Sequence, residues 1–171
     1  MSLEIDIVVA ASQWNSVDDL EGLTNRCVAA SLENCLLALA SDCEISVTYC
    51  DDDTITQLNA QWRGKNAPTN VLSFPTPGLL EDRRLLGDII IAFQTVTREA
   101  KEFGKPLPSY IGHMLIHGVL HLVGYDHETE TEAEIMENLE RLIALKMDLG
   151  DPYENEDDMR SSSIKIEAEL N

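Results

Sequence analysis

Apolar residues that alternate with polar ones, or that form short runs, mark the β-strands of the chain. Residues 3–9 alternate apolar and acidic side chains, which is typical of a half-buried strand. Three more segments have strand character: residues 44–50, the short segment 71–74, and residues 85–93. With helices between them, these segments predict an α+β domain built on one four-stranded mixed sheet.

About five helices are expected between and after the strands. They lie within residues 18–40, at 51–62 with Gly64 closing the helix, at 95–103, from an N-cap at Ser109 to a stop at Gly124, and at 130–149. Residues 64–70, which are rich in Gly, Pro and Asn, and residues 74–85, where Pro75 and Pro77 oppose regular structure, are expected to be loops. Residues 1–150 thus form a single domain, and the polar, acidic residues 151–171 form a C-terminal tail that is expected to be flexible.

Charge is strongly unbalanced along the 171 residues. The chain has 12 Lys+Arg against 31 Asp+Glu, a formal net charge of -19, which by itself opposes binding to nucleic acid. Residues 128–171 hold 14 acidic and 4 basic residues, whereas residues 61–110 hold 5 acidic and 7 basic residues. An anionic ligand is therefore expected to bind near residues 61–110.

The cysteines and the apolar segments bear on location. Cys27, Cys35, Cys43 and Cys50 include no CxxC pair, so they are expected to be small buried residues rather than metal ligands or a redox pair. The N-terminus lacks the basic start of a secretory signal, which favours a reducing, cytoplasmic location. The apolar segment 111–125 is shorter than a membrane span and contains three histidines, so no membrane association is expected.

All four histidines of the chain fall within fifteen residues. His117 and His121 are four residues apart, so on a helix their imidazoles can share one metal ion. Gly124 can end that helix in a left-handed conformation and return His127 as a third ligand. Three imidazoles with an open fourth position are the ligand set of a catalytic zinc. The alternative is a set of core histidines satisfied by hydrogen bonds. His113, one turn earlier, is a fourth contact, a group that supports a ligand, or a packed histidine.

The spacing of these residues equals that of the metzincin protease signature HExxHxxGxxH. Gly118, however, occupies the position of the catalytic glutamate, and glycine cannot act as a general base. Peptide hydrolysis by that mechanism is therefore disfavoured. Phosphodiester cleavage asks instead for stabilisation of phosphoryl oxygens by the metal and by an arginine or lysine. The spacing does not choose between zinc and other metals that imidazole binds.

Two stretches together resemble the YbeY family of metal-dependent endoribonucleases. They are HGVLHLVGYDH at 117–127 and QWRGKNAPTNVLSFPTP at 61–77, and LGDIIIAF at 86–93 is similar to a third family segment. The resemblance implies a fold with a zinc-metalloprotease-like metal helix, zinc held by His117, His121 and His127, and a functional arginine at Arg63. It also implies cleavage of single-stranded RNA, 3′-end maturation of small-subunit ribosomal RNA, and ribosome quality control.

The roles of the remaining candidates stay open at the level of sequence. Arg63 and His117 are the expected catalytic residues, although Arg63 by itself could be a cation at a helix end. Lys65 and Asn70 are candidate substrate-binding residues beside Arg63, and a surface charge or a strand cap would explain them as well. Arg83, Arg84, Thr69 and Ser73 are weaker candidates, Ser73 being the more structural one. Asp126 could orient a ligand imidazole or cap the next helix.

Three functional hypotheses follow. The first is a zinc-dependent endoribonuclease acting on ribosomal RNA. The second is a metallohydrolase of another class, with a peptidase nearest by motif. The third is a ribosome assembly factor in which zinc holds the fold and the acidic surface docks the small subunit, one of its basic proteins, or an Era-like GTPase.

Overall fold

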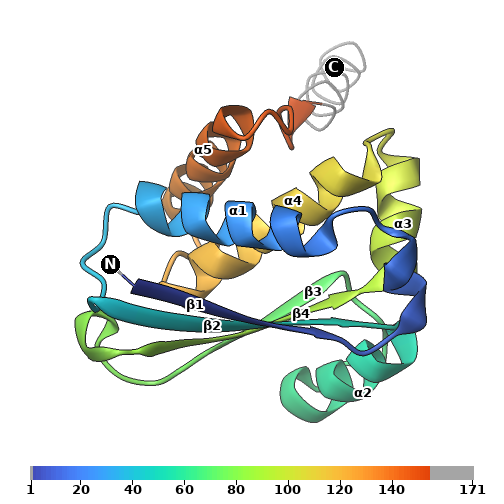
Figure 1. The fold of residues 1–171 in the computed structure, drawn as a ribbon, viewed down its shortest axis with the longest axis horizontal. Coiled ribbons are helices and arrows are strands. Elements are labelled where there is room, and N and C mark those ends of the chain that lie inside the picture. Colours follow the sequence, from blue (N-terminus) through green and yellow to red (C-terminus); the bar gives the residue numbers. More distant parts are fainter. Residues whose placement is uncertain (1, 155–171) are drawn as a thin grey trace, which may run out of the picture.

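The computed structural model describes residues 2–154, and these form one four-stranded sheet with helices on both faces (Figure 1). The strands are β1 (Ser2–Val9), β2 (Asp42–Cys50), β3 (Val71–Pro75) and β4 (Leu85–Ala92), in the spatial order β1-β2-β4-β3. β1, β2 and β4 are parallel, and β3 runs antiparallel to β4 at one edge. The predicted mixed sheet is thereby confirmed.

Five α-helices complete the fold, as predicted. They are α1 (Leu20–Asn34), α2 (Asp52–Arg63), α3 (Phe93–Glu102), α4 (Leu107–Leu122) and α5 (Glu130–Lys146), with short 3-10 helices at Ser12–Ser16 and Leu80–Asp82. Figure 1 shows α2 on one face of the sheet and α1, α4 and α5 on the other. No helix of residues 2–154 has the length and apolar character that a bilayer crossing requires.

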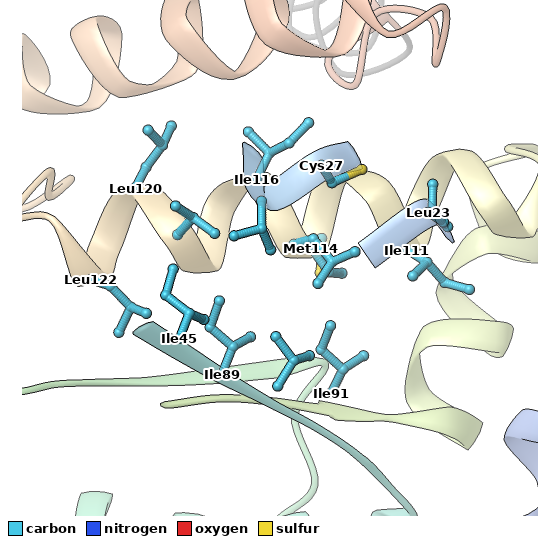
Figure 2. Close-up of a cluster of buried hydrophobic side chains, with 14 of the residues drawn as sticks. Leu23, Cys27, Ile45, Ile89, Ile91, Ile111, Met114, Ile116, Leu120 and Leu122 are labelled. Carbon is cyan, nitrogen blue, oxygen red and sulfur yellow. The ribbon is translucent and has the colours of Figure 1, made fainter. Parts of the chain in front are cut away.

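Helix α4 is the centre of the core. Ten of its residues are buried, because α1, α5 and the sheet surround it. Figure 2 shows Ile111, Met114 and Leu122 of α4 above Ile89 and Ile91 of the sheet. A helix that is apolar almost all round must lie inside the protein, which fits its sequence. His113, His117 and His121 therefore lie on an enclosed element.

The ends of α4 differ partly from the prediction. The predicted N-cap at Ser109 is wrong, because the helix begins at Leu107 after Pro106, with Pro108 inside its first turn. Proline fits there, since the first-turn N–H groups have no partner within the helix. Gly124 does end the helix: it has a φ of 106°, and the N–H groups of Gly124 and Tyr125 donate to the carbonyls of His121 and Leu120. This pattern is a Schellman motif, which reverses the chain.

Smaller boundary differences affect α3 and the C-terminal residues. The helix expected at 95–103 begins at Phe93, so the preceding strand ends at Ala92. All four cysteines are buried free thiols, as predicted. Of the predicted tail, residues 155–171 lie outside the described residues, whereas residues 151–154 pack near α5 and Pro152 is buried.

Candidate metal centre

Three histidines converge at the C-terminal end of α4. The Nε2 atoms of His117 and His121 lie 3.0 Å apart. The turn at Gly124 brings His127 back, so that its ring centroid is 5.0 Å from that of His121 and 5.8 Å from that of His117. One ligand atom from each of the three lies within 4.8 Å of the others. The structure therefore brings together the three side chains that the sequence singles out.

Hydrogen bonds on the far side of two rings fix which nitrogen faces inward. Nδ1 of His121 lies 3.0 Å from the Tyr125 carbonyl oxygen, and Nδ1 of His117 lies 2.8 Å from Oε1 of Glu140. Both acceptors require an N–H on Nδ1, so each neutral ring keeps a lone pair on Nε2. Two lone pairs 3.0 Å apart repel each other unless a cation lies between them. Two nitrogens bound to one tetrahedral zinc would lie about 3.3 Å apart, so the donor set fits a metal ion.

The protonation of His121 also suits a metal ligand. Its pKa is lowered from 6.5 to about 4, first by burial and then by the neighbouring His117 and His127. The hydrogen bond to the Tyr125 carbonyl acts in the opposite direction and does not reverse the shift. At neutral pH the His121 imidazole is therefore neutral, as metal coordination demands.

Glu140 of α5 is the main site residue that sequence reasoning missed. Its side chain is 1 % exposed, and its two oxygens lie 2.8 Å from His113 Nε2 and from His117 Nδ1. Burial raises its pKa, but the hydrogen bonds and charges of the two histidines outweigh burial and bring the pKa to about 2. A carboxylate on the Nδ1 side of a ligand imidazole fixes the ring orientation and strengthens the ligand. The Tyr153 hydroxyl also donates to Glu140.

The sequence did contain a signal for Glu140. On α5 it shares a buried face with Met136, Ile143 and Ala144, at spacings of four and three residues. An acid on the apolar face of an amphipathic helix needs a buried partner, because an unpaired buried charge is costly. Its partners could not be identified from sequence, since His117 and His113 lie on α4, 23 and 27 residues earlier.

His113 lies beside Glu140, on the Nδ1 side of His117. Its Nε2 contacts Glu140, and its Nδ1 is buried without a hydrogen-bond partner. Together His113, His117 and Glu140 form a second group of potential ligand atoms that shares His117 with the first. His113 therefore supports the ligand side chains through Glu140, one of the roles left open by the sequence.

A cavity of about 580 Å³ opens beside the three converging histidines. Its opposite wall is the edge strand β3, with Asn70 before it and Val71, Ser73 and Pro75 within it. Arg63, the last residue of α2, also lines the cavity. Its guanidinium donates to the Ser73 carbonyl at 2.9 Å and lies 5.5 Å from the centre of the Phe74 ring. The expected catalytic pair, Arg63 and His117, thus faces one space.

The other sequence candidates are distributed unevenly. Asn70 lines the cavity, but its amide donates to Glu99 and its carbonyl accepts from the Val71 N–H. The Lys65 side chain is exposed on the following loop and does not line the cavity. Arg84 pairs with Glu4 at 3.1 Å and Arg83 donates to the Thr76 carbonyl, so both are engaged elsewhere.

Two further candidates have structural roles. Asp126 accepts from the His127 backbone N–H, and α5 is capped by a Thr129 capping box with Glu132, so Asp126 is not the helix cap. The Ser73 hydroxyl lies 3.4 Å from the Gly118 carbonyl and links β3 to α4.

Gly118 has a packing role that its sequence position did not reveal. A Cβ atom at this position would lie 3.0 Å from the Ile89 side chain. Glycine therefore allows α4 to approach β4 closely. A glutamate in its place would meet the sheet, which strengthens the inference that no protease-type base acts here.

Comparisons with known proteins agree with this geometry. The family model described as endoribonuclease YbeY matches residues 8–148. Proteins named endoribonuclease YbeY from Methylocella silvestris and Bartonella quintana are 44% and 45% identical to the chain, each over 88% of it and over 85% and 97% of their own lengths. The solution structure of TM1509 from Thermotoga maritima superimposes with a TM-score of 0.54 at 27% identity, over 84% of this chain and 91% of that one. The chain belongs to the endoribonuclease YbeY family.

Proposed function

We propose that this protein is a zinc-dependent endoribonuclease that cleaves single-stranded RNA. One observation carries the proposal: three imidazoles converge on one point, the outer nitrogens of His117 and His121 are already hydrogen-bonded, and Arg63 lines the same cavity. A metal ion without positive charge opposite it would suit many hydrolases. The guanidinium adds a group that recognises phosphate in particular.

His117, His121 and His127 would hold the zinc ion. When bound, zinc supplies Lewis acidity, which lowers the pKa of a bound water and polarises a phosphoryl oxygen. Glu140 and the Tyr125 carbonyl hold the rings of His117 and His121 in their metal-binding tautomer. Arg63 is oriented by the Ser73 carbonyl and by Phe74, and it stabilises the charge that develops on the phosphoryl oxygens.

The cellular substrate follows from the family. We place the activity at the 3′ end of small-subunit ribosomal RNA and in ribosome quality control, within the cytoplasm, where buried free thiols such as these persist. The net charge of -19 favours docking to a basic partner, such as a small-subunit protein, or to an Era-like GTPase, because the acidic surface opposes RNA. A partner would then bring RNA and enzyme together.

A peptidase is the nearest other enzyme, and two observations oppose it. Gly118 supplies no general base, and its Cβ direction points at Ile89. An extended peptide substrate would pair with the free edge of β3, but the Ser73 carbonyl at that edge already accepts from Arg63. A non-catalytic assembly factor would need the metal and the acidic surface but not Arg63 in the cavity.

The decisive experiment is cleavage of an end-labelled single-stranded RNA, and of its duplex, by the zinc-loaded protein. Arg63→Ala should keep zinc and lose roughly 10²–10³-fold in rate, and His117→Ala should lose both zinc and cleavage. Arg98→Ala is the matched control, because Arg98 pairs with Glu102 on the surface of α3. Equal cleavage by all four proteins would identify a contaminant. Cleavage of unfolded protein that depends on His117 would favour the peptidase instead.

A further inference from the structure

Trp62 is an unusual surface residue. It lies in the last turn of α2, next to Arg63, and is 63 % exposed, which makes it the most exposed aromatic residue among residues 2–154. The other tryptophan, Trp14, is 1 % exposed and donates from its indole to the Cys50 carbonyl. An isolated exposed apolar residue needs no explanation, so the surroundings of Trp62 decide its significance.

Trp62 forms one wall of a groove on the α2 face of the sheet. The groove has a volume of about 550 Å³ and is lined by Leu58, Trp62, Arg63, Phe74, Pro75, Asp88 and Ile90. The Trp62 and Phe74 ring centroids are 6.2 Å apart and their planes are inclined by 61°. The two rings therefore form a corner rather than a stack, which leaves ring surface free for a third planar group.

This groove adjoins the histidine cavity. Arg63 and Pro75 line both spaces. Along β3, Phe74 points to the α2 side and packs with Leu72, whereas Ser73 points to the α4 side and contacts Gly118. The Arg63 guanidinium binds the Ser73 carbonyl at the free edge between these two faces. A chain that passes the edge of β3 at Arg63 would thus contact both the histidines and Trp62.

The charges of the groove favour a base over a phosphate as its ligand. Asp88 is exposed in the groove wall, and its carboxylate would repel a phosphate. The same carboxylate can accept hydrogen bonds from the amino groups at base edges. Arg63 supplies the positive charge at the junction with the histidine cavity. The arrangement suits a phosphate at Arg63 and an adjoining base against the aromatic rings.

We propose that the groove lined by Trp62 and Phe74 is a nucleobase subsite, which holds one unstacked base of a strand whose phosphate lies at Arg63. This assignment rests on the proposed function for the identity of the strand. A base in a duplex is stacked and cannot enter the groove, so the subsite gives the preference for single strands a physical cause.

Fluorescence titration tests the subsite without cleavage. The zinc-loaded protein is titrated with a short 2′-O-methyl RNA strand, which binds without being cut. A base stacked on Trp62 should quench indole emission. The change can be assigned to Trp62, because the other tryptophan, Trp14, is buried and lines neither the groove nor the histidine cavity. Trp62→Phe should abolish the quenching and keep most of the affinity. Trp62→Ala should weaken binding by about 5- to 150-fold, the range for one lost stacked base.

Two controls make the result specific. Leu145→Ala removes an equally exposed apolar side chain from α5 and should leave the affinity unchanged. A strand with the same backbone but without bases should bind the wild-type protein and Trp62→Ala equally. The proposal is overturned if the wild-type protein does not bind the strand, if Trp62→Ala binds it as tightly as wild type does, or if the strand without bases shows the same loss. If the groove binds a protein partner instead of a base, Trp62→Ala should bind the strand as tightly as wild type does.

The proposed function is judged separately. If RNA cleavage depends on His117 and Arg63 but affinity does not depend on Trp62, the enzyme assignment stands and the subsite fails. If Trp62→Ala weakens binding but no preparation cleaves RNA, the subsite stands and catalysis fails.

Discussion

Two groups of side chains share His117 and differ in almost every other respect. His121, which is half-buried, and His127, which is exposed, lie beside it on an open cavity. His113 and Glu140 lie beside its Nδ1, at 14 % and 1 % exposure, and are joined by hydrogen bonds of 2.8 Å. In the open group, the Nε2 lone pairs of His117 and His121 face each other. In the closed group, each oxygen of the Glu140 carboxylate accepts a hydrogen bond from a histidine.

This difference indicates that the open group binds the metal and that the closed group orients a ligand ring, although the same residue types could do either. Both groups could hold a metal ion by composition and distance. The open group borders the cavity of about 580 Å³ that Arg63 also lines, whereas the cavity of about 280 Å³ beside His113 and His117 is lined by no arginine or lysine. The closed group instead fixes the orientation of a ligand ring. We therefore expect substitutions in the open group to abolish metal binding and cleavage, and those in the closed group to weaken metal binding by a smaller factor.

The largest effect is expected from the open group. His121→Ala removes a ligand with a lone pair directed at the metal position. Loss of a residue that hydrogen-bonds to a metal ligand typically lowers metal affinity about 10–100-fold. Loss of the ligand itself should lower zinc affinity by more than this, and RNA cleavage should cease. Equilibrium zinc titration against a competing chelator measures this, with circular dichroism as the check on folding. Retention of wild-type affinity would show that His121 is not a ligand.

Glu140→Gln tests the closed group. Glutamine keeps the volume but removes the charge and one acceptor oxygen, so His117 loses its carboxylate partner. Zinc affinity should fall about 10–100-fold while cleavage at saturating zinc is largely kept. Glu134→Gln on the exposed face of α5 is the matched control. Complete loss of activity at saturating zinc would contradict a purely orienting role for Glu140.

Acid should affect the two groups in different pH windows in the metal-free protein. The His121 pKa is lowered to about 4 on folding, so below pH 6.5 the unfolded chain binds the proton first and stability falls between about 6.5 and 4. The Glu140 pKa is lowered from 4.5 to about 2, so its contribution is present above 4.5 and is lost between about 4.5 and 2. Each window should cost at most about 3 kcal/mol of unfolding free energy.

Urea unfolding at a series of pH values measures this dependence. Glu140→Gln should remove the lower window and leave the upper one. Stability that rises as pH falls from 6.5 to 4 would contradict a buried neutral His121.

Tyr153→Phe should have the smallest effect. The substitution removes the hydroxyl that donates to Glu140 and keeps the ring, which lies 5.3 Å from the His113 ring and under Arg141. We expect a loss of about 0.5–1.5 kcal/mol in unfolding free energy and less than tenfold in zinc affinity. Thermal unfolding and zinc titration check both values. An effect larger than that of Glu140→Gln would assign Tyr153 a direct role at the metal.

The open group could be predicted from sequence, whereas the closed group could be predicted only as far as His113. His117, His121 and His127 follow local rules: a four-residue helical spacing and a glycine that reverses the chain. Their partners Glu140 and Tyr153 reach them only through the packing of α5 on α4, which no local spacing encodes. For the same reason Tyr153 fell within the predicted tail, although it contacts the domain.

The strand order of the fold and the role of Gly118 likewise needed the structure. Residue patterns predicted four strands and five helices, with the start of α3 shifted by two residues and the N-cap of α4 by three. The position of β3 at the sheet edge, beyond β4, was not encoded in any single segment. That position brings Arg63 round the edge strand into the cavity. Gly118 was interpreted as a missing base, and its packing on Ile89 emerged only from the contacts.

The most direct test of the account compares His127→Gln with His113→Gln. His127 belongs only to the open group and His113 only to the closed group, and both substitutions replace imidazole with an amide. Zinc affinity, measured by chelator competition on folded protein, should collapse in His127→Gln and fall by no more than about 10–100-fold in His113→Gln. If His113→Gln lost zinc and His127→Gln retained it, the metal would lie in the closed group, and the proposed active site would be wrong.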